Sequence, residues 1–337
     1  MSAIPRFPRF VNVDLGLKPE VQAFTRQHAG YSDFNFTNLH SWNNDDGIAV
    51  SWLYDNLVVR FRDYVTNETF YTFLGNRHPV YTAQTLLGQA KHSGFLPNLK
   101  LIPEEIALKL QEADQFIITE DQDNNDYILS LQKLAQLVGR PQAHTRELVN
   151  RFKRELGPTS SFIELDLSNE QTKVEILHIF HDREDLKITN DAANEKDAIT
   201  RLLNNFESYD LVAYGIRVDK KLRAFIICEL HDAHPVLAHF WKADTRLRGI
   251  YHYLLNCVAR ELQQLGHELL NFEQDLGIPG LRAAKQFLRP EKFLRKYTVT
   301  LPVSRTLFKT EPSDDVQGIG MTKISRKYAG AIDGVLG

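Results

Sequence analysis

The same order of secondary-structure elements occurs twice along this chain, and no other feature constrains the fold as much. Alternating apolar residues on either side of a polar turn predict one hairpin over residues 47–64 and another over 211–230. After each hairpin the pattern continues as strand, helix, strand, helix and strand, without an obvious repeat in the sequence itself. Strands that alternate with helices are typical of mixed sheets. The sequence therefore predicts an α/β protein with α+β mixed sheets, built from two similar domains in tandem.

A helical segment separates the two repeats. One helical pattern covers residues 129–138, and a second follows Gly139-Arg140-Pro141 and stops at Gly157-Pro158. A single strand predicted over 293–299 closes the second repeat, and the rest of the chain lacks sustained periodicity. These boundaries divide the chain into a first domain, a linker helix, a second domain and a tail, at residues 1–140, 141–158, 159–302 and 303–337.

Composition and cysteine content narrow the class of protein. Hydrophobic residues make up 43% of the chain and charged ones 25%, as in an ordinary soluble domain, and no run reaches the roughly 18 apolar residues of a membrane span. The two cysteines, Cys228 and Cys257, lie in apolar surroundings, which is typical of buried thiols in a reducing compartment. We therefore expect a cytoplasmic protein without a membrane span, and peripheral contact with a membrane stays open.

The stretch that carries the most chemistry covers residues 271–285. Its apolar start, followed by Glu273 and Asp275, predicts a strand that delivers two carboxylates to the edge of a sheet. Two glycines and a proline then turn the chain into a helix that carries Arg282 and Lys285. Ligand sites in open α/β sheets lie at such edges, so this stretch is a candidate site. The alternative is a charged turn closed by its own salt bridge.

A second candidate lies at the start of the strongest predicted helix, which runs from about residue 248 to 266. Free backbone N–H groups at a helix start, together with Arg246 and Arg248, can bind an anion. The spacing of Arg246, Gly249 and Tyr251 resembles the loop with which GNAT-type acyltransferases hold the pyrophosphate of acetyl-CoA. Tyr251 stands where that loop has a small residue, which weakens a CoA interpretation and leaves a phosphate site open. A plain basic turn is the alternative.

Basic residues gather in two blocks although the net charge of the chain is −3. Residues 139–156 contain five basic and two acidic side chains, a net of +3, and residues 279–300 contain six and one, a net of +5. If both blocks share a face, that face could hold a polyanion such as RNA, with Arg140, Arg151 and Lys153 among its contacts. Solvated helix faces are the alternative.

A metal site is not expected. His178 and His181, and likewise His231 and His234, stand three residues apart, but no cysteine or carboxylate set completes a ligand group. The sequence also lacks a P-loop, a nucleophile elbow and a strand-linked dinucleotide fingerprint.

Five segments of the chain resemble a known protein family. The most specific is 271–285, and the others are 31–42, 126–130, 150–153 and 294–297. Together they resemble the soluble members of the phosphatidylglycerol lysyltransferase C-terminal domain family, which is related to Fem-type aminoacyltransferases. The resemblance implies two tandem GNAT folds, in agreement with the repeated order of elements. Membrane-anchored relatives move an amino acid from aminoacyl-tRNA to a lipid hydroxyl. The resemblance therefore implies an aminoacyl-tRNA donor, no further cofactor, and roles in transfer for Asp275 and Arg282.

The residues suit such a reaction. An aminoacyl ester is already activated, so the enzyme has to position it, accept a proton and stabilise charge. Asp275 or Glu273 could take the proton of the acceptor or hold the ammonium of the donor, while Arg282 and Lys285 could stabilise an oxyanion or grip phosphates. The acceptor could be a lipid, a peptide or a small molecule with a hydroxyl or an amine. Two alternatives are a CoA-dependent N-acyltransferase and a non-catalytic RNA-binding relative.

Overall fold

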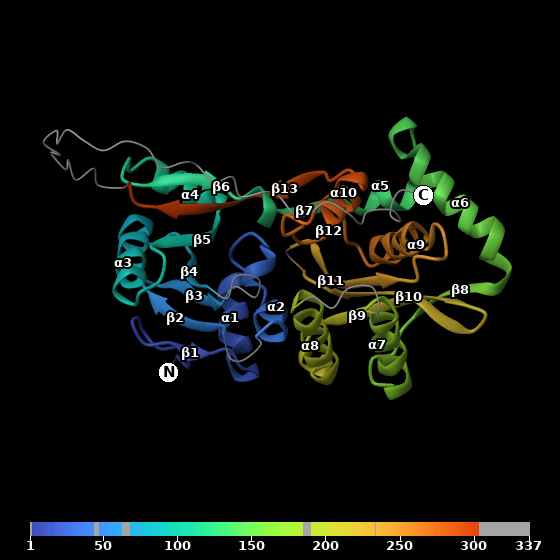
Figure 1. The fold of residues 1–337 in the computed structure, drawn as a ribbon, viewed down its shortest axis with the longest axis horizontal. Coiled ribbons are helices and arrows are strands. Elements are labelled where there is room, and N and C mark those ends of the chain that lie inside the picture. Colours follow the sequence, from blue (N-terminus) through green and yellow to red (C-terminus); the bar gives the residue numbers. More distant parts are fainter. Residues whose placement is uncertain (1, 44–46, 63–67, 185–189, 233, 303–337) are drawn as a thin grey trace, which may run out of the picture.

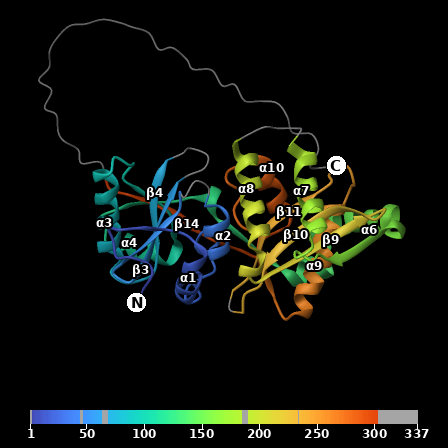
Figure 2. The same cartoon turned by 90° about the horizontal axis from the view of Figure 1, so that it is seen from below.

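The computed structural model of the protein describes residues 2–43, 47–62, 68–184, 190–232 and 234–302. The expected tail, 303–337, lies outside these residues. The described chain forms two halves that lie side by side, each built on a seven-stranded sheet with helices against it (Figures 1 and 2). None of the helices among the described residues is both long and apolar enough to cross a membrane.

The first sheet has the strand order β1-β2-β3-β4-β5-β14-β6. Its pairs are antiparallel except for β4 and β5, which run parallel because helix α3 connects them. A buried cluster that includes Phe73, Leu86 and Ile106 packs α3 and α4 against the sheet. The elements of this half are β1 (Val11–Asn12), β2 (Ala49–Leu53), β3 (Asn56–Arg62), β4 (Thr69–Leu74), α3 (Pro79–His92), β5 (Asn98–Pro103), α4 (Glu104–Gln111), β6 (Ile117–Glu120) and β14 (Lys296–Thr300).

The second sheet has the strand order β13-β7-β12-β11-β10-β9-β8. It repeats the plan of the first, since its parallel pair, β11 and β12, is again connected by a helix, α9. Helices α7 and α8 cover one face and α9 the other (Figure 1). The elements are β7 (Asp126–Ser130), α5 (Leu131–Gln136), α6 (Ala143–Leu156), β8 (Ser160–Glu164), α7 (Glu170–Glu184), α8 (Asn190–Asn204), β9 (Leu211–Val218), β10 (Lys221–Glu229), β11 (Val236–Ala243), α9 (Ile250–Gln264), β12 (Leu269–Asn271), α10 (Pro279–Phe287) and β13 (Lys292–Leu294). The expected fold class, with two mixed sheets in tandem, is confirmed.

The two sheets do not follow the expected domain boundaries, because each receives one strand from the other half's part of the sequence. β7, within the expected first domain, pairs with β12 and β13 of the second sheet. β14, within the expected second domain, pairs with β5 and β6 of the first sheet. The single strand predicted over 293–299 is therefore two strands, and only Arg295 separates them. An apolar run predicts a strand but not the sheet that strand will join.

One hydrophobic cluster continues from the first half into the second. Two short helices of the N-terminal region, α1 (Lys18–Thr25) and α2 (Phe36–Ser41), lie between the sheets (Figure 1). Val21 and Phe36 belong to the same buried cluster as Leu202 of α8 and Phe240 of β11. The two halves therefore share a core as well as two exchanged strands.

Candidate active site at the junction of the two sheets

The stretch 271–285 lies where the second sheet meets the N-terminal region. β12 ends at Asn271, and the chain then continues alongside β7, with Phe272 N donating to Tyr127 O (2.8 Å) and Tyr127 N donating to Glu273 O (3.1 Å). The backbone of Glu273 is left-handed, with a φ of 56°, which is uncommon for a residue with a long side chain. This conformation sends the chain out of the strand and towards α10.

Asp275 is sealed inside this turn. Its side chain has no exposed surface, and its two carboxylate oxygens accept four hydrogen bonds, from Tyr127 Oη (2.5 Å), Arg282 Nε (2.9 Å), Arg282 Nη2 (2.7 Å) and Gly277 N (2.8 Å). Burial raises the pKa of Asp275, but these hydrogen bonds outweigh it and hold the pKa below its usual value. The carboxylate is therefore charged at neutral pH and fixes the position of Arg282. The ion pair between Asp275 and Arg282 is the one expected for the alternative interpretation of this stretch, a charged turn closed by its own salt bridge.

Arg282 joins this anchor to the surface. Its Nη2 also donates to Asp123 Oδ1 (2.5 Å), and about a third of its side chain is exposed. The two carboxylates raise the pKa of the guanidinium, so it stays charged. Its Nη1 has no hydrogen bond to any residue that the structure describes. The Nη1 group of Arg282 can therefore donate hydrogen bonds to a ligand, while Asp275 and Asp123 fix the orientation of the guanidinium.

Glu273 has a different environment from Asp275. Its side chain is 18% exposed, and Oε1 accepts a hydrogen bond from Asn38 Nδ2 (2.8 Å) of α2. The same oxygen lies 3.4 Å from Nδ1 of His239 on β11. Glu273 is therefore the carboxylate of this stretch that is partly exposed to solvent, and Asn38 and His239 fix its position from the buried side.

His239 lies between two carboxylates. Its side chain is fully buried, its Nε2 lies 3.0 Å from Glu229 Oε2, and its Nδ1 lies 2.9 Å from Asn38 Oδ1. Burial lowers the pKa of the imidazole, but Glu229 and Glu273 outweigh it and raise the pKa to about 9. For Glu229 burial has the opposite effect and raises the pKa. The contacts with His239 outweigh burial and lower the pKa of Glu229 to about 2. We call Glu229, His239 and Glu273 the buried carboxylate–histidine row.

Lys285 fixes the backbone on either side of Glu273. Its buried Nζ donates to Phe272 O (2.5 Å) and Gln274 O (2.7 Å). The ammonium also lies 5.4 Å from the ring centroid of Phe272, and burial lowers its pKa to about 8. Because its ammonium is buried and bonded to these carbonyl groups, Lys285 stabilises the turn and is not available to bind a phosphate from solvent.

A second buried charge cluster connects the exchanged strands. Nζ of Lys296 (β14) lies 2.7 Å from Asp126 Oδ1 (β7), donates to Gln274 Oε1 (2.7 Å) and forms an ion pair with Asp33. Asp126 also accepts hydrogen bonds from the backbone N (2.8 Å) and Oγ (2.6 Å) of Ser32. Burial raises the pKa of Asp33 to about 6, against the lowering effect of Lys296. The cluster ties both sheets to the segment that contains α2.

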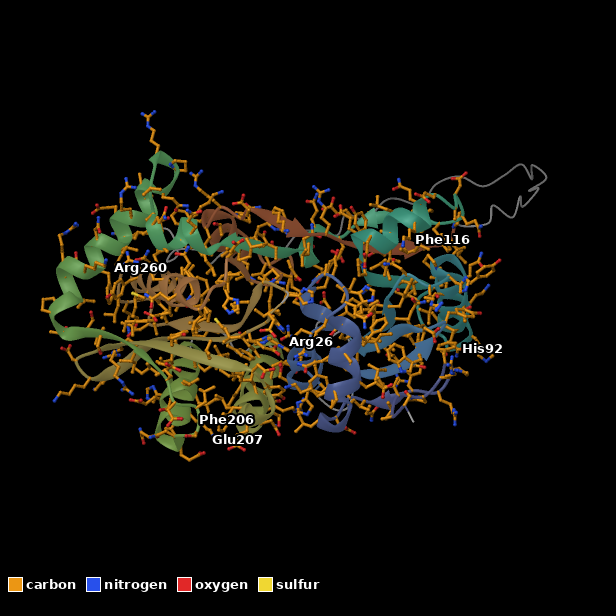
Figure 3. All side chains as sticks on the ribbon, turned by 180° about the vertical axis from the view of Figure 1, so that it is seen from behind. Arg26, His92, Phe116, Phe206, Glu207 and Arg260 are labelled. Atoms are coloured by element: carbon orange, nitrogen blue, oxygen red, sulfur yellow. The ribbon has the colours of Figure 1, made fainter. Side chains whose placement is uncertain are left out.

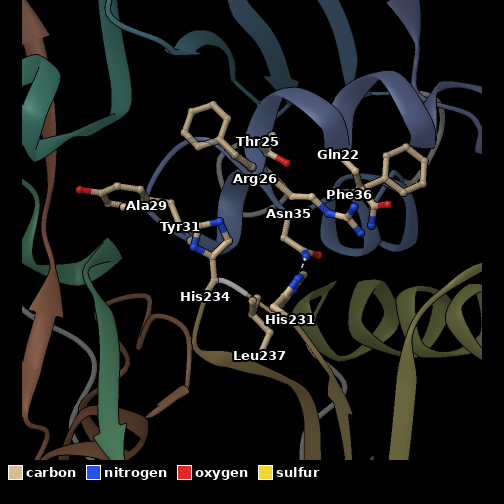
Figure 4. Close-up of a pocket in the computed structure, with 12 residues that line it drawn as sticks. Gln22, Thr25, Arg26, Ala29, Tyr31, Asn35, Phe36, His231, His234 and Leu237 are labelled. Atoms are coloured by element: carbon tan, nitrogen blue, oxygen red, sulfur yellow. Dashed lines mark hydrogen bonds between the residues drawn. The ribbon is translucent and has the colours of Figure 1, made fainter. Parts of the chain in front are cut away.

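A small cleft of about 30 Å³ is lined by residues of the N-terminal region, such as Asn35, and of the segment between β10 and β11, such as His231 (Figure 4). Asn35 and His231 face each other across it, with Nδ2 and Nε2 at 3.3 Å, and Asn35 Nδ2 also donates to Glu229 Oε2 (2.9 Å). Arg26 lies at the cleft, between the two halves of the molecule (Figure 3). Glu229 Oε1 is buried and has no hydrogen-bond partner among the described residues.

The predicted anion loop at the start of α9 is occupied by protein contacts. Arg246 binds Asp244 through two hydrogen bonds (2.7 and 2.8 Å), and the ring of Tyr251 packs edge-on against Trp241 at 4.7 Å. Gly249 has a φ of 84°, and a Cβ there would collide with the carbonyl oxygen of Leu148 on α6. Arg248 is exposed. The linker helix therefore covers the loop where a pyrophosphate would have to approach.

The predicted RNA contacts lie on or next to α6, at the outer edge of the second half (Figure 1). Arg140 is exposed, Arg151 Nε pairs with Glu155 Oε1 (2.8 Å), and Lys153 Nζ lies 5.7 Å from the ring centroid of Tyr253. In the second basic block Arg289, Lys292 and Arg295 are exposed, and a surface shared with α6 stays a prediction. Lys285 and Lys296 are buried, and the other paired members of the block are Arg282 and Arg295.

The sequence did not identify His239, Glu229 or Asn38 as site residues. Glu229 ends an apolar strand, and a carboxylate at such a position is itself a signal, because buried carboxylates need partners. Among the described residues, no group of three or more histidine, cysteine or carboxylate side chains could hold a metal ion, and the side chain of His181 lies outside that part.

Comparison with known proteins identifies the family. The family model described as phosphatidylglycerol lysyltransferase, C-terminal, matches residues 24–300. The chain belongs to this family. That membership confirms the resemblance seen in the sequence and supports an acyltransferase-type function related to lysylphosphatidylglycerol synthesis. No curated protein matches the sequence significantly.

Solved structures agree with this family fold. A conserved protein of unknown function from Bacteroides thetaiotaomicron is 25% identical, with a TM-score of 0.75 over 87% of this chain and 99% of that one. L-PGS from Bacillus licheniformis is 13% identical, with a TM-score of 0.58 over 88% and 93%. The C-terminal domain of a protein from Agrobacterium fabrum described as a lysylphosphatidylglycerol synthetase is 12% identical, with a TM-score of 0.60 over 85% and 92%.

Proposed function

We propose that the protein is an aminoacyltransferase that moves an amino acid from aminoacyl-tRNA to a hydroxyl or amine of a lipid, a peptide or a small molecule. The observation that carries this proposal is the position of Glu273. Its carboxylate reaches solvent, while Asn38 and the fully buried His239 hold it from behind. Such a carboxylate can take a proton without a large change in geometry.

The proposed reaction needs few groups. The acceptor oxygen or nitrogen attacks the ester carbonyl of the aminoacyl-tRNA, the bond to the ribose oxygen breaks, and that oxygen leaves with a proton. Glu273 accepts the proton that the acceptor loses and passes it to the leaving ribose oxygen, so it ends the step as a carboxylate again. The ester is already activated, so positioning and charge stabilisation can drive the step without a covalent intermediate on the enzyme.

The neighbouring charges have separate tasks in this proposal. Arg282 stabilises the oxyanion through its unused Nη1, since Nε and Nη2 already bind Asp275 and Asp123. Asp275 positions Arg282 and takes no proton, because donors occupy both of its oxygens. Lys285 positions the backbone of Glu273.

Acetyl-CoA remains the alternative donor, and the contacts at the start of α9 weigh against it. Tyr251 is fixed against Trp241, and Gly249 lies directly under the backbone of α6. A phosphate there would compete with Asp244 for Arg246. For the tRNA, the exposed side chains of Arg140 and Lys153 and the half-buried Arg151 offer a basic surface on the linker helix.

The test is transfer of a radiolabelled amino acid from tRNA to acceptor pools of lipid, peptide or small molecules. Glu273→Gln keeps the size of the side chain but cannot accept the proton, so we expect transfer to fall roughly 10²- to 10⁴-fold. Glu268→Gln, at an exposed carboxylate just before β12, is the matched control and should keep full activity. Full activity of Glu273→Gln would refute the assigned role.

A further inference from the structure

A larger cavity, of about 350 Å³, lies at the tip of the β2–β3 hairpin, next to the start of α3. This volume falls within the range of pockets that hold small ligands. Its wall includes Arg6 of the N-terminal segment, Tyr54 and Asp55 of the hairpin turn, and Arg77 and His78 of the loop before α3. We call it the arginine–tyrosine cavity. It belongs to the first half and shares no residue with the site at the junction.

The charge of the arginine–tyrosine cavity suits an anion. The side chains of Arg6 and Arg77 are 77% and 66% exposed, and both flank the single carboxylate of Asp55. The distances, 3.9 and 3.8 Å, are too long for hydrogen bonds. Two guanidinium groups against one carboxylate leave a net charge of +1, and their planar forks can bind a phosphate.

The aromatic side chains suit a flat ring. Tyr54 is 46% exposed and lies edge-on to His78, with ring centroids 6.0 Å apart. The row continues to Tyr81, which is 64% exposed and lies 6.4 Å from His78. Bases of nucleotides stack on exposed aromatic rings of this kind, next to cations that neutralise the phosphate.

The wall of the cavity is held in an unusual backbone conformation. Tyr54, Asp55 and His78 have φ values of 51°, 58° and 45°, a left-handed region that bulky residues rarely adopt. The fully buried Asn56 ties the hairpin to the loop before α3, because its side chain donates to Arg77 O (2.7 Å) and accepts from Arg77 N (3.0 Å). These hydrogen bonds hold the hairpin turn and the loop before α3 together as one wall of the cavity.

We propose that the arginine–tyrosine cavity binds a nucleotide, with the phosphate between Arg6 and Arg77 and the base stacked on Tyr54. The shared chemistry is a phosphate joined to a planar base, and a single-stranded RNA segment or a free nucleotide can supply it. Binding at this cavity requires no transfer activity, so the proposal stands or falls separately from the assignment of Glu273.

Calorimetry on the full-length protein at low salt tests the proposal with three probes: AMP, a 5′-phosphorylated uridine hexamer and inorganic phosphate. We expect a nucleotide probe to bind at least tenfold more tightly than phosphate, because only the nucleotide can also stack. A hexamer that binds tenfold more tightly than AMP identifies RNA as the source, and equal affinities identify a free nucleotide. Equal binding of phosphate and both nucleotide probes, or no binding of any probe, would overturn the proposal.

Variants locate the binding. Arg77→Gln removes a charge at an exposed side chain, and Tyr54→Gly removes the ring at a position whose backbone suits glycine, so each should weaken nucleotide binding about tenfold. Asp55→Asn removes the carboxylate that competes for both arginines and should strengthen it severalfold. Lys221→Gln, at an exposed lysine on β10, is the matched control. Circular dichroism confirms folding of each variant, and unchanged affinity in both Arg77→Gln and Tyr54→Gly would refute this site.

Discussion

Glu273 and Asp275 stand two residues apart, yet their surroundings give them different chemistry. The sequence places both in a turn beside basic residues, and this part of the candidate site could be predicted. What distinguishes them comes from distant parts of the chain. Tyr127, which helps to seal Asp275, is 148 residues away, and Asn38, which holds Glu273, is 235 residues away. Local patterns contain no information about such contacts, so the sequence could not decide between the two carboxylates.

His239 gives the buried carboxylate–histidine row a measurable pH dependence. Its pKa of about 9 lies above the ordinary value of 6.5, so the folded protein holds a proton that the unfolded chain releases. The stabilisation of the folded protein by the charged imidazole of His239 is therefore complete below pH 6.5 and is lost as the pH rises through about 9. Lys285 acts in the opposite direction above pH 8, because its pKa of about 8 lies below the ordinary 10.5. The effect of His239 is thus clearest between pH 6.5 and 8.

We expect the change in the free energy of unfolding in urea between pH 6.5 and 8 to be more negative in the wild type than in His239→Gln, because only the wild type holds this proton when folded. Four other histidines, whose pKa values are lowered, act in the opposite direction in both proteins. The substitution keeps a polar side chain between Glu229 and Asn38 but cannot carry the proton. His92→Gln, at an exposed histidine that ends α3, should leave the slope as it is in the wild type. The same slope in His239→Gln and in the wild type would mean that another group binds the proton.

At the scale of elements, the sequence predicted long periodic segments well and short ones poorly. The helix expected from about residue 248 to 266 is α9, Ile250–Gln264, because seven of its residues are buried at helical spacing. The last two residues of β7, Leu129 and Ser130, were interpreted as the start of a helix, because they lead directly into α5. β13 and β14 merged into one predicted strand for a similar reason. Their pairing partners are distant in sequence, so no local signal separates them.

The contact between α6 and the start of α9 can be tested with two glycines. Gly249 and Gly266 both have left-handed backbones, with φ values of 84° and 89°. A Cβ at Gly266 would meet nothing within 4 Å, whereas a Cβ at Gly249 would collide with Leu148 O. We expect Gly266→Ala to cost about 1 kcal/mol through backbone strain alone, and Gly249→Ala to cost roughly 2–4 kcal/mol. Thermal unfolding measures both, and equal losses would contradict the close contact with the linker helix.

At the scale of the whole molecule, the two halves are connected in three ways. β7 and β14 are exchanged between the sheets, Lys296 pairs across them with Asp126, and one hydrophobic cluster includes residues of both halves. The sequence predicted two tandem domains joined by a linker helix, without exchanged strands, because the repeated order of elements reports local structure only. The candidate site depends on this connection, since Asn38 comes from the N-terminal region and His239 from the second sheet.

These connections predict that the halves unfold together. Loss of the first sheet would release β14 and leave Asp126 buried without Lys296, and a broken buried ion pair costs about 3–5 kcal/mol. Hydrogen exchange measured by mass spectrometry across a urea titration should therefore show one midpoint for β3 and β10, which lie in different sheets. Lys296→Met should lower both midpoints equally, whereas Lys100→Met, at a partly exposed lysine of β5, should leave both close to the wild-type value. Two midpoints in the wild type, or a loss confined to one sheet in Lys296→Met, would mean that each half keeps its own stability despite the exchanged strands.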